Sequence, residues 1–321
     1  MVKAIVVHAH GGPEVLGIVE KPTPEPGIGE VLIDVAAAGV NYIDVYHRSG
    51  LYPVETPFTP GLEGAGTVAA VGDEVTEFAV GDAVAWSQVP GSYASQLVAP
   101  ASSLVRVPDD VPPTTAAASL LQGLTALILS SQTYEISGGD VVVVHAGAGG
   151  VGMLLIQLAK LRGARVITTV STEAKAELAR QVGADEVIGY DGFADQVAKL
   201  TDGDKAHVVY DGVGAATFDG SLRSLRPRGL LVLFGQASGP VPPMDPQVLA
   251  QHGSLYLTRP TAGHYLATPE RMRHMAQELF GIVTSSSLSI RVGGEYELEH
   301  ATVAHKDLQA RRTTGKLLLM P

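Results

Sequence analysis

The chain has 321 residues, of which 45% are hydrophobic and 17% charged, so it has ample apolar material for buried cores and is not of the disordered class. Its formal net charge of −11 argues against a polyanion as the main partner, and its lack of cysteine excludes disulfides, a thiolate nucleophile and cysteine-ligated zinc. It has no uninterrupted apolar stretch of about 18 residues and no apolar signal-peptide core. We therefore expect a cytoplasmic protein of two domains.

The first part of the chain, residues 1–120, is expected to be mostly β. Short apolar runs alternate there with proline, glycine and aspartate, which is typical of strands joined by tight turns. The expected strands are Lys3–Val7, Gly17–Lys21, Glu30–Ala38, Gly66–Val71, Ala83–Trp86, Tyr93–Ala99 and Ser103–Pro108. Together they predict a small distorted barrel.

The composition changes after Pro112-Pro113, where the Ala- and Leu-rich stretch Thr114–Leu129 predicts one or two helices. From Val141 onward, strand patterns alternate with helix patterns, which predicts a parallel sheet wound on both faces. The expected strands are Val141–His145, Arg165–Val170, Glu186–Ile188, Ala206–Tyr210, Gly229–Phe234 and Gly253–Thr258. The expected helices are Gly152–Arg162, Thr172–Val182, Phe193–Leu200 and Thr217–Leu225.

The last part of the chain changes character again after Arg259-Pro260. Helices are expected over Pro269–Val283 and Val303–Arg312, followed by a strand over Gly315–Met320. These elements have no place in a standard nucleotide-binding half, so the tail is expected to return to the first domain. The predicted organisation is a catalytic domain over 1–120, a nucleotide-binding domain over 121–260 and a return to the catalytic domain over 261–321.

A glycine-rich turn follows the most strongly predicted strand. Four consecutive valines, Val141–Val144, indicate a strand buried on both faces, and a helical apolar pattern resumes at Met153. The turn between them contains Gly147, Gly149, Gly150 and Gly152, more glycines than an ordinary strand-to-helix turn requires. Glycine permits unusual backbone angles and lets a pyrophosphate reach bare N–H groups at a helix N-terminus. This stretch therefore predicts the phosphate-binding corner of a dinucleotide site.

Motifs spread over the whole chain resemble those of the medium-chain dehydrogenase/reductase superfamily. The motifs are Gly39-Val40-Asn41 with Asp44, Gly61-Leu62-Glu63-Gly64-Ala65-Gly66, Gly81-Asp82 and the glycine turn Ala146–Gly152. Three further stretches resemble the zinc-free quinone oxidoreductases, the zeta-crystallin branch: Asn41–Asp44, Arg48–Pro53 and Gly253–Pro260. The resemblance implies an α/β protein with a GroES-like distorted β-barrel catalytic domain and a doubly wound Rossmann domain. It also implies NADPH:quinone reductase activity.

The positions that hold zinc in other members of the superfamily are changed here. Zinc alcohol dehydrogenases carry a cysteine where Asn41 stands and a histidine where Leu62 stands, and their structural zinc lobe needs four cysteines. An amide and an aliphatic side chain do not hold Zn²⁺ with useful affinity. The ten histidines show no ligand-like spacing, and most of them are expected on the surface or in loops. The sequence therefore predicts a metal-free enzyme.

The choice of cofactor is predicted from the end of the second nucleotide-binding strand. An Asp or Glu at that point binds the ribose 2′-hydroxyl of NAD, but here the chain reads Thr168-Thr169-Val170-Ser171, and Glu173 comes later. By resemblance, Ser171, Lys175 and Tyr190 contact the 2′-phosphate of NADPH. The alternative for Lys175 is an ordinary solvated helix lysine. We predict NADPH rather than NADH.

The resemblance also implies the remaining site residues. Asn41 and Tyr52 are the candidate catalytic residues, because without zinc a substrate carbonyl must be polarised by hydrogen-bond donors. The expected cofactor contacts, besides those to the 2′-phosphate, are Asn41, Tyr52, Thr125, Gly149, Gly150, Val151, Gly152, Phe234, Gly235, Gln236 and Arg311. The contact at Gln236-Ala237 is expected to differ, because the branch often has asparagine or serine there.

Three functions remain open on the sequence. The first is hydride transfer from NADPH to a quinone, and the second is NADPH-dependent reduction of an enone or enoyl double bond, which uses the same geometry. The third is an NADPH-binding protein with little turnover, either crystallin-like or RNA-element-binding, although the acidic charge counts against RNA. A homodimer is expected, because the strand Gly253–Thr258 would be a bare sheet edge and the resemblance points the same way.

Overall fold

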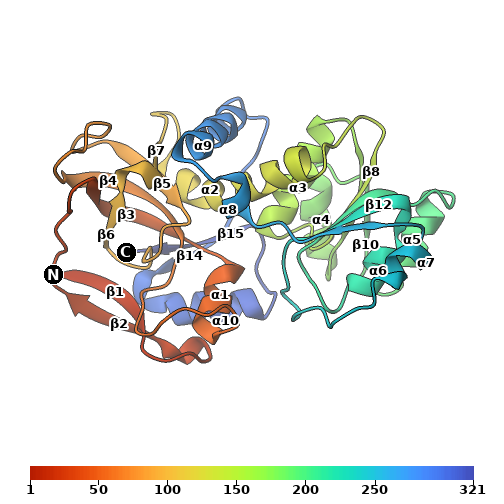
Figure 1. Ribbon diagram of the computed structural model, residues 1–321, viewed down its shortest axis with the longest axis horizontal. Helices are drawn as coiled ribbons and strands as arrows, with labels where there is room; N and C mark the ends of the chain where they lie inside the picture. The colour runs from red at the N-terminus through yellow and green to blue at the C-terminus, as the bar shows by residue number, and fades with distance from the viewer. The chain divides into compact units, whose positions relative to one another are not determined.

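The computed structural model describes all residues, 1–321, and divides into two compact units. Unit 1 comprises residues 1–124, 266–286 and 290–321, and unit 2 comprises residues 125–265 and 287–289 (Figure 1). The sequence placed the two internal boundaries near residues 120 and 260. The C-terminal strand, drawn in blue, belongs with the N-terminal strands of unit 1.

Unit 1 is built on one seven-stranded sheet and a separate hairpin. The sheet has the order β14-β15-β3-β4-β5-β7, with β6 paired to β3, and β1 pairs with β2 in the hairpin. The strands are β1 (Val2–Val7), β2 (Leu16–Lys21), β3 (Glu30–Val40), β4 (Glu63–Val71), β5 (Ala83–Ser87), β6 (Gln96–Pro100), β7 (Leu104–Arg106), β14 (Val292–Glu297) and β15 (Lys316–Met320). Each of the seven strands predicted in residues 1–120 has a counterpart among β1–β7, which agrees with the β-rich character expected there.

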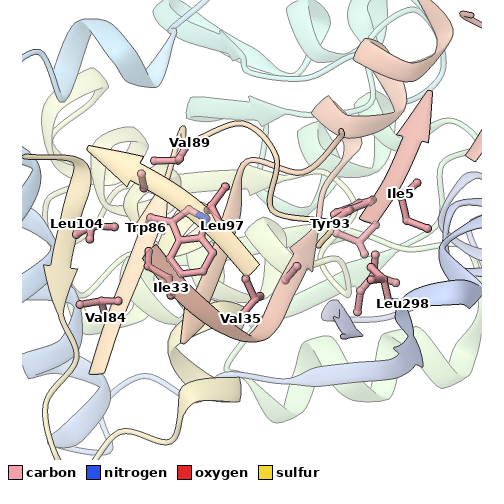
Figure 2. Packing of buried hydrophobic residues seen from close by; sticks show 14 of the residues in the cluster. Ile5, Ile33, Val35, Val84, Trp86, Val89, Tyr93, Leu97, Leu104 and Leu298 are labelled. Atoms are coloured by element: carbon pink, nitrogen blue, oxygen red, sulfur yellow. The ribbon is translucent and has the colours of Figure 1, made fainter. Parts of the chain in front are cut away.

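The long strand β3 organises this sheet. It pairs antiparallel with β4, with β6 and with β15, so the last residues of the chain lie beside residues 38–40. Apolar side chains from these strands fill the core of the unit. Figure 2 shows Trp86 against Ile33 and Leu97, with Tyr93, Ile5 and Leu298 gathered at the other end of the cluster.

Helices of unit 1 begin and end where capping chemistry allows. The helix α1 (Tyr42–Ser49), which the sequence analysis did not predict, starts at Asn41, whose backbone N–H donates to Asp44 Oδ2 at 2.8 Å. It ends at Gly50 in the left-handed conformation, φ 77°. The other helices are α2 (Pro113–Ile128), whose residues to 124 belong to this unit, α9 (Pro269–Thr284) and α10 (Ala301–Gln309), with 3₁₀ turns η1 (Pro13–Val15), η2 (Ala101–Ser103) and η4 (Leu298–His300).

Unit 2 contains a six-stranded, fully parallel sheet in the order β10-β9-β8-β11-β12-β13. Its strands are β8 (Val141–Val144), β9 (Arg165–Thr169), β10 (Glu186–Ile188), β11 (Ala206–Asp211), β12 (Leu225–Leu233) and β13 (Tyr256–Thr258). Its helices are α3 (Gly150–Leu161), α4 (Glu173–Gln181), α5 (Phe193–Leu200), α6 (Phe218–Arg223), α7 (Gln247–Gln251) and α8 (Ala262–Tyr265), after a π turn η3 (Leu129–Thr133). The strand order reverses direction between β8 and β11, so right-handed crossovers place helices on both faces. The predicted doubly wound parallel sheet is confirmed.

The differences from the predicted elements have local causes. The final strand of this sheet starts at Tyr256 rather than at Gly253, because Gly253 and Ser254 have φ angles of 105° and 58° and form a turn. Strand β14 was not predicted, because its segment contains Gly293 and Gly294, which weaken the pattern of a strand. The helices α7 and α8 are only five and four residues long, too short for a periodic signal.

One helical segment is long and apolar enough to cross a membrane by length and composition. It runs over Pro113–Thr133, which is α2 followed by the π turn η3. In the structure, 67% of its most apolar window is buried inside the protein. This segment is therefore a core helix.

Candidate functional site

The glycine turn of unit 2 has the geometry of a phosphate-binding corner. It leaves the central strand β8 through Ala146, whose φ is 56°, and enters α3 at Gly149, which has no side-chain cap. A Cβ on Gly147 would overlap Thr168 Oγ1, and one on Gly152 would overlap the carbonyl oxygen of Ala146. Glycine is therefore required by close packing at these two positions. The first N–H groups of α3 are left for an anion to approach.

Three other predicted site stretches follow the carboxyl ends of neighbouring parallel strands. Ser171 follows β9, Tyr190 follows β10 and Phe234–Gln236 follow β12. Carboxyl ends of parallel strands meet at one edge of the sheet, so the fold brings these residues to the edge that also carries the glycine turn. Thr125, the first residue of unit 2, lies near the end of α2.

The loops after β11 and β12 come together backbone to backbone. A Cβ on Gly235 would lie 2.6 Å from the carbonyl oxygen of Gly212, and one on Gly212 would lie 2.8 Å from the Phe234 ring. Gly214 adopts a φ of 90°. Two of the predicted cofactor contacts, Phe234 and Gly235, therefore lie in a segment whose path depends on glycine.

No carboxylate occupies the position directly after β9. The helix α4 begins at Glu173, with Thr172 as its N-cap accepting from the Lys175 backbone N–H at 3.3 Å. The Glu173 side chain is 81% exposed and accepts from Arg180 at 2.6 Å. The half-buried Lys175 lies in the first turn of this helix. The edge of the sheet near Ser171 and Lys175 therefore suits a phosphate better than a bare ribose hydroxyl.

A buried polar network that the sequence analysis missed ties three of the strand ends together. His145, directly after β8, contacts Thr169 Oγ1 at 2.8 Å and Ser221 Oγ at 3.0 Å. Ser221 donates to Asp211 Oδ2 at 2.8 Å, and Thr217 donates to both oxygens of the same carboxylate. Burial lowers the pKa of His145, with Asp211 opposing, so this imidazole is neutral and serves as a hydrogen-bonding spacer.

His145 is an exception to the expectation that most histidines lie on the surface or in loops, and its sequence context explains why. The residue continues a run of four valines, so the strand carries it into the core, where it is 1% exposed. Its ring stacks on Tyr190 with centroids 6.2 Å apart, and Phe193 approaches edge-on at 4.7 Å. Tyr190, predicted at the 2′-phosphate, is thus positioned by the same network.

In unit 1 the candidate site residue Asn41 is buried and fully engaged. Its Nδ2 donates to Glu63 Oε2 at 2.9 Å and to the Gly39 carbonyl at 3.3 Å. Its Oδ1 accepts from Lys316 Nζ at 2.8 Å and from Gln122 Nε2 at 3.3 Å. Both amide hydrogens therefore already have acceptors within the protein.

Glu63 and Lys316 form a buried ion pair beside this amide. The Lys316 ammonium contacts Glu63 Oε2, and the two side chains are 1% and 0% exposed. The second oxygen of Glu63 accepts from the backbone N–H of Leu121 at 2.6 Å. Glu63 stands within the glycine-rich motif quoted above, and a carboxylate among glycines on a buried strand was the available signal for it.

Tyr52, the second candidate catalytic residue, lies beyond the other end of α1. Its backbone N–H donates to the Tyr46 carbonyl at 3.1 Å, and its ring lies 5.1 Å from that of Tyr46. The side chain is half-buried. Arg311, predicted to reach the cofactor, is exposed, has a φ of 55° and follows α10 in the same unit.

A second buried chain of hydrogen bonds connects helices α1 and α10. Arg48 Nη1 lies 3.2 Å from His305 Nδ1, His305 Nε2 lies 3.0 Å from the Tyr93 hydroxyl, and that hydroxyl donates to Asp44 Oδ2 at 2.9 Å. A guanidinium can only donate, so His305 accepts at Nδ1 and carries its proton on Nε2. The chain of donors therefore runs in one direction, from Arg48 to Asp44.

Burial shifts the pKa values along this chain. It raises the pKa of Asp44 from 3.8 to about 7, with the bonds from Asn41 and Tyr93 acting against it, and Asp44 Oδ1 has no hydrogen-bond partner. Burial together with the nearby Arg48 cation lowers the pKa of His305 to about 3. His305 is therefore neutral over the physiological range. This histidine is a second exception to the surface expectation.

The fold does not assemble a metal site. No three His, Asp or Glu side chains come together in an arrangement that would hold a metal ion. Asn41 is hydrogen-bonded to Glu63 and Lys316, and Leu62 is buried directly before β4. Neither side chain offers a ligand to Zn²⁺.

Both parts of the chain match known family models. Residues 27–109 match the alcohol dehydrogenase GroES-like domain, and residues 150–280 match the zinc-binding dehydrogenase family. These matches confirm the predicted combination of a GroES-like domain with a Rossmann-like parallel sheet.

Full-length relatives are also known. The chain is 49% identical over 325 residues to a quinone oxidoreductase of Pseudomonas aeruginosa, with 100% of both chains covered. It is 39% identical to a 2-haloacrylate reductase of a Burkholderia species, covering 100% of this chain and 99% of the relative. The solved structure of a mycobacterial protein complexed with NADPH is similar with a TM-score of 0.97 and 51% identity, covering 99% of this chain and 100% of that one. The chain belongs to the quinone oxidoreductase family of the medium-chain dehydrogenase/reductase superfamily.

Proposed function

We propose that this protein is an NADPH-dependent quinone oxidoreductase that transfers hydride to a quinone without a metal ion. The observation that carries the proposal is the edge of the parallel sheet in unit 2. It combines an uncapped, glycine-lined helix N-terminus with a strand tip that lacks a carboxylate. The first feature accepts a pyrophosphate and the second accepts a 2′-phosphate. The relatives named above support the cofactor and the acceptor.

The residues of unit 2 divide between the pyrophosphate in the middle of the dinucleotide and the 2′-phosphate on its adenosine ribose. Backbone N–H groups of Gly149, Gly150, Val151 and Gly152 bind the pyrophosphate at the start of α3. The glycine turn fits a pyrophosphate. Close packing allows only glycine at Gly147 and Gly152, so no side chain at these positions stands between the ligand and the backbone N–H groups. Ser171, Lys175 and Tyr190 hold the 2′-phosphate, with Tyr190 braced by His145.

The remaining residues serve the nicotinamide and the acceptor. Thr125, Phe234, Gly235 and Gln236 from unit 2 and Asn41, Tyr52 and Arg311 from unit 1 complete the cofactor contacts. When bound, NADPH supplies the hydride, that is, two electrons and one proton. The Tyr52 hydroxyl polarises the acceptor carbonyl, and protons for the reduced quinone oxygens come from water. Asn41, whose amide hydrogens are held by Glu63 and Gly39, contacts the cofactor.

The experiment that tests this function is NADPH oxidation by the purified protein across quinones, enones and enoyl thioesters. We expect kcat/KM to be highest for a quinone and NADPH to be preferred over NADH. A protein that oxidised NADPH only with activated double bonds would be an enone reductase instead. That second function is favoured by the similarity to the 2-haloacrylate reductase. Tight NADPH binding without turnover on any acceptor would indicate a binding protein.

We further propose a homodimer located in the cytoplasm. Strand β13 is an edge strand of the parallel sheet, and its Tyr256 and Leu257 are 57% and 36% exposed. Pairing with the same strand of a second copy would cover the unpaired backbone groups of this edge. Light scattering at micromolar concentration checks this, and a monomeric mass would contradict it.

A further inference from the structure

The side-chain amide of Asn41 is held by opposite charges at its two ends. The ammonium of Lys316 donates to Oδ1 at 2.8 Å, and the carboxylate of Glu63 accepts from Nδ2 at 2.9 Å. An ammonium only donates and a carboxylate only accepts. A flipped amide would therefore place N–H groups against the cation and oxygen against the anion, so only one orientation is allowed.

The ion pair reaches this amide across the central strand of the sheet. Glu63 begins β4 and Lys316 begins β15, and these two strands flank β3. The space over β3 is provided by Gly39, because a Cβ there would overlap Glu63 Oε2 and lie 2.7 Å from Lys316 Cε. The backbone of β3 therefore leaves room for the pair beside Asn41.

Stability does not account for this arrangement. Both side chains are almost fully buried, and such an ion pair is often no more stable than neutral side chains of similar size. What the pair does provide is a defined orientation of one amide. That amide belongs to Asn41, which is predicted at the nicotinamide.

We infer that Lys316 is a positioning residue for the hydride-transfer site. Together with Glu63 it locks the Asn41 amide in one orientation, and it acts on the reaction through that amide without touching the substrate. The inference rests on the proposed function, because the role of Asn41 at the nicotinamide is part of that proposal.

The test removes both charges together. The single variant Lys316→Met would leave a buried carboxylate without its cation and risks unfolding. The double variant Glu63→Gln/Lys316→Met keeps the side-chain sizes similar and buries no unpaired charge. Its kcat, its KM for a quinone and its Kd for NADPH are compared with those of the wild type, and its urea midpoint reports folding.

The expected result is a loss of about 10- to 150-fold in kcat/KM with a nearly unchanged urea midpoint, the size of one hydrogen bond to a charged group. In a protein that already carries Asn41→Ala, the same double substitution is expected to lower kcat/KM by a further factor of less than about 2. The effects of residues that act through one another are not additive. The Asn41→Ala change keeps the backbone bond to Asp44 but removes the side-chain half of the capping box at the start of α1, so its urea midpoint is measured as well.

A matched control is available in unit 2. Lys160 and Asp185 form a 2.8 Å ion pair whose side chains are about one-third exposed. The variant Lys160→Met/Asp185→Asn is expected to leave kcat, KM and Kd at wild-type values. Glu63→Gln/Lys316→Gln repeats the main test with a shorter polar side chain.

Two kinetic results would overturn the inference: wild-type kcat/KM in the folded double variant, or an equal loss with and without Asn41. Failure of both double variants to fold would also overturn it, since the pair would then be structural. If the wild type reduces no acceptor, the proposed function fails. The coupling of Lys316 to Asn41 is then tested by the Kd for NADPH. Non-additive effects of their substitutions on this Kd would support the coupling, and additive effects would contradict it.

Discussion

The predicted site residues of unit 1 and those of unit 2 are surrounded by different chemical groups. Unit 2 uses backbone, glycine and neutral hydroxyl and imidazole groups around one carboxylate, Asp211. Unit 1 uses buried charges, namely the Glu63–Lys316 pair and the chain that ends at Asp44. Backbone N–H groups suit the binding of a multiply charged anion such as a pyrophosphate. Buried charges suit the orientation of single groups, because their partners permit only one hydrogen-bond arrangement.

The difference also lies in how far apart the partners are in the sequence. The glycine turn and helix α3 are consecutive residues, whereas Lys316 is 275 residues from Asn41 and 253 from Glu63. The site in unit 2 is therefore mostly local, and the site in unit 1 exists only after the C-terminal strand has joined the sheet. Four predictions test this contrast.

The largest effect is expected from Gly152→Ala. The added Cβ would overlap the Ala146 carbonyl, and backbone cannot move aside as a side chain can. NADPH binding should fall more than about 100-fold, or the free energy of unfolding should fall by about 1–3 kcal/mol, as for overpacked cores. NADPH titration and urea unfolding measure both. Gly281→Ala, in helix α9 with nothing within 4 Å of its Cβ, is the matched control and should be neutral or slightly stabilising.

A smaller and more selective effect is expected from Lys175→Ala. A hydrogen bond to a charged group is worth about 1.5–3 kcal/mol, so NADPH affinity should fall about 10- to 150-fold while NADH affinity stays unchanged. Added salt should weaken NADPH binding more than NADH binding, because it screens the extra charge. Equal loss of both cofactors would make Lys175 a structural helix residue, and a wild type that prefers NADH would remove the NADPH assignment.

Two buried titratable groups of unit 1, Asp44 and His305, predict opposing dependences of stability on pH. The pKa of Asp44 is raised to about 7, so its contribution to stability is complete below its unfolded value and is lost as the pH rises toward 7. The pKa of His305 is lowered to about 3, so its contribution is complete above 6.5 and is lost as the pH falls toward 3. Between about pH 4 and 6.5 the two slopes cancel in the wild type.

Single variants should separate these slopes. In Asp44→Asn only the pH dependence that comes from His305 remains. The unfolding free energy of this variant should therefore rise by about 1.4 kcal/mol per pH unit across this window relative to the wild type. His305→Gln, whose amide can accept from Arg48 and donate to Tyr93, should show the opposite slope. Urea unfolding at three pH values in this range is sufficient. Parallel curves for all three proteins would contradict the assigned protonation states.

No effect is expected from metal removal. The positions of Asn41 and Leu62 carry no zinc ligand, and the chain has no cysteine. Elemental analysis should find no stoichiometric zinc, and chelators should leave NADPH oxidation unchanged. Near-equimolar zinc lost together with activity would overturn the metal-free mechanism.

The sequence predicted the features that depend on neighbouring residues. The run of valines and the glycines after it specify β8, the turn and α3 within about 20 residues, and the alternation of strands and helices specifies the parallel sheet. The absence of a carboxylate after β9 and of zinc ligands at Asn41 and Leu62 is likewise visible in the sequence itself. These features are readable because their physical requirements are met within a single segment of chain.

The tertiary structure alone decided which polar residues are buried together. The local pattern indicates burial for Glu63 and His145 and gives no signal for Lys316 or His305. The partners of all four come from strand pairing and helix packing. The orientation of the Asn41 amide follows from a lysine near the other end of the chain. A buried polar group requires a partner, but sequence spacing does not say which one, because the pairing is made only when distant strands enter one sheet.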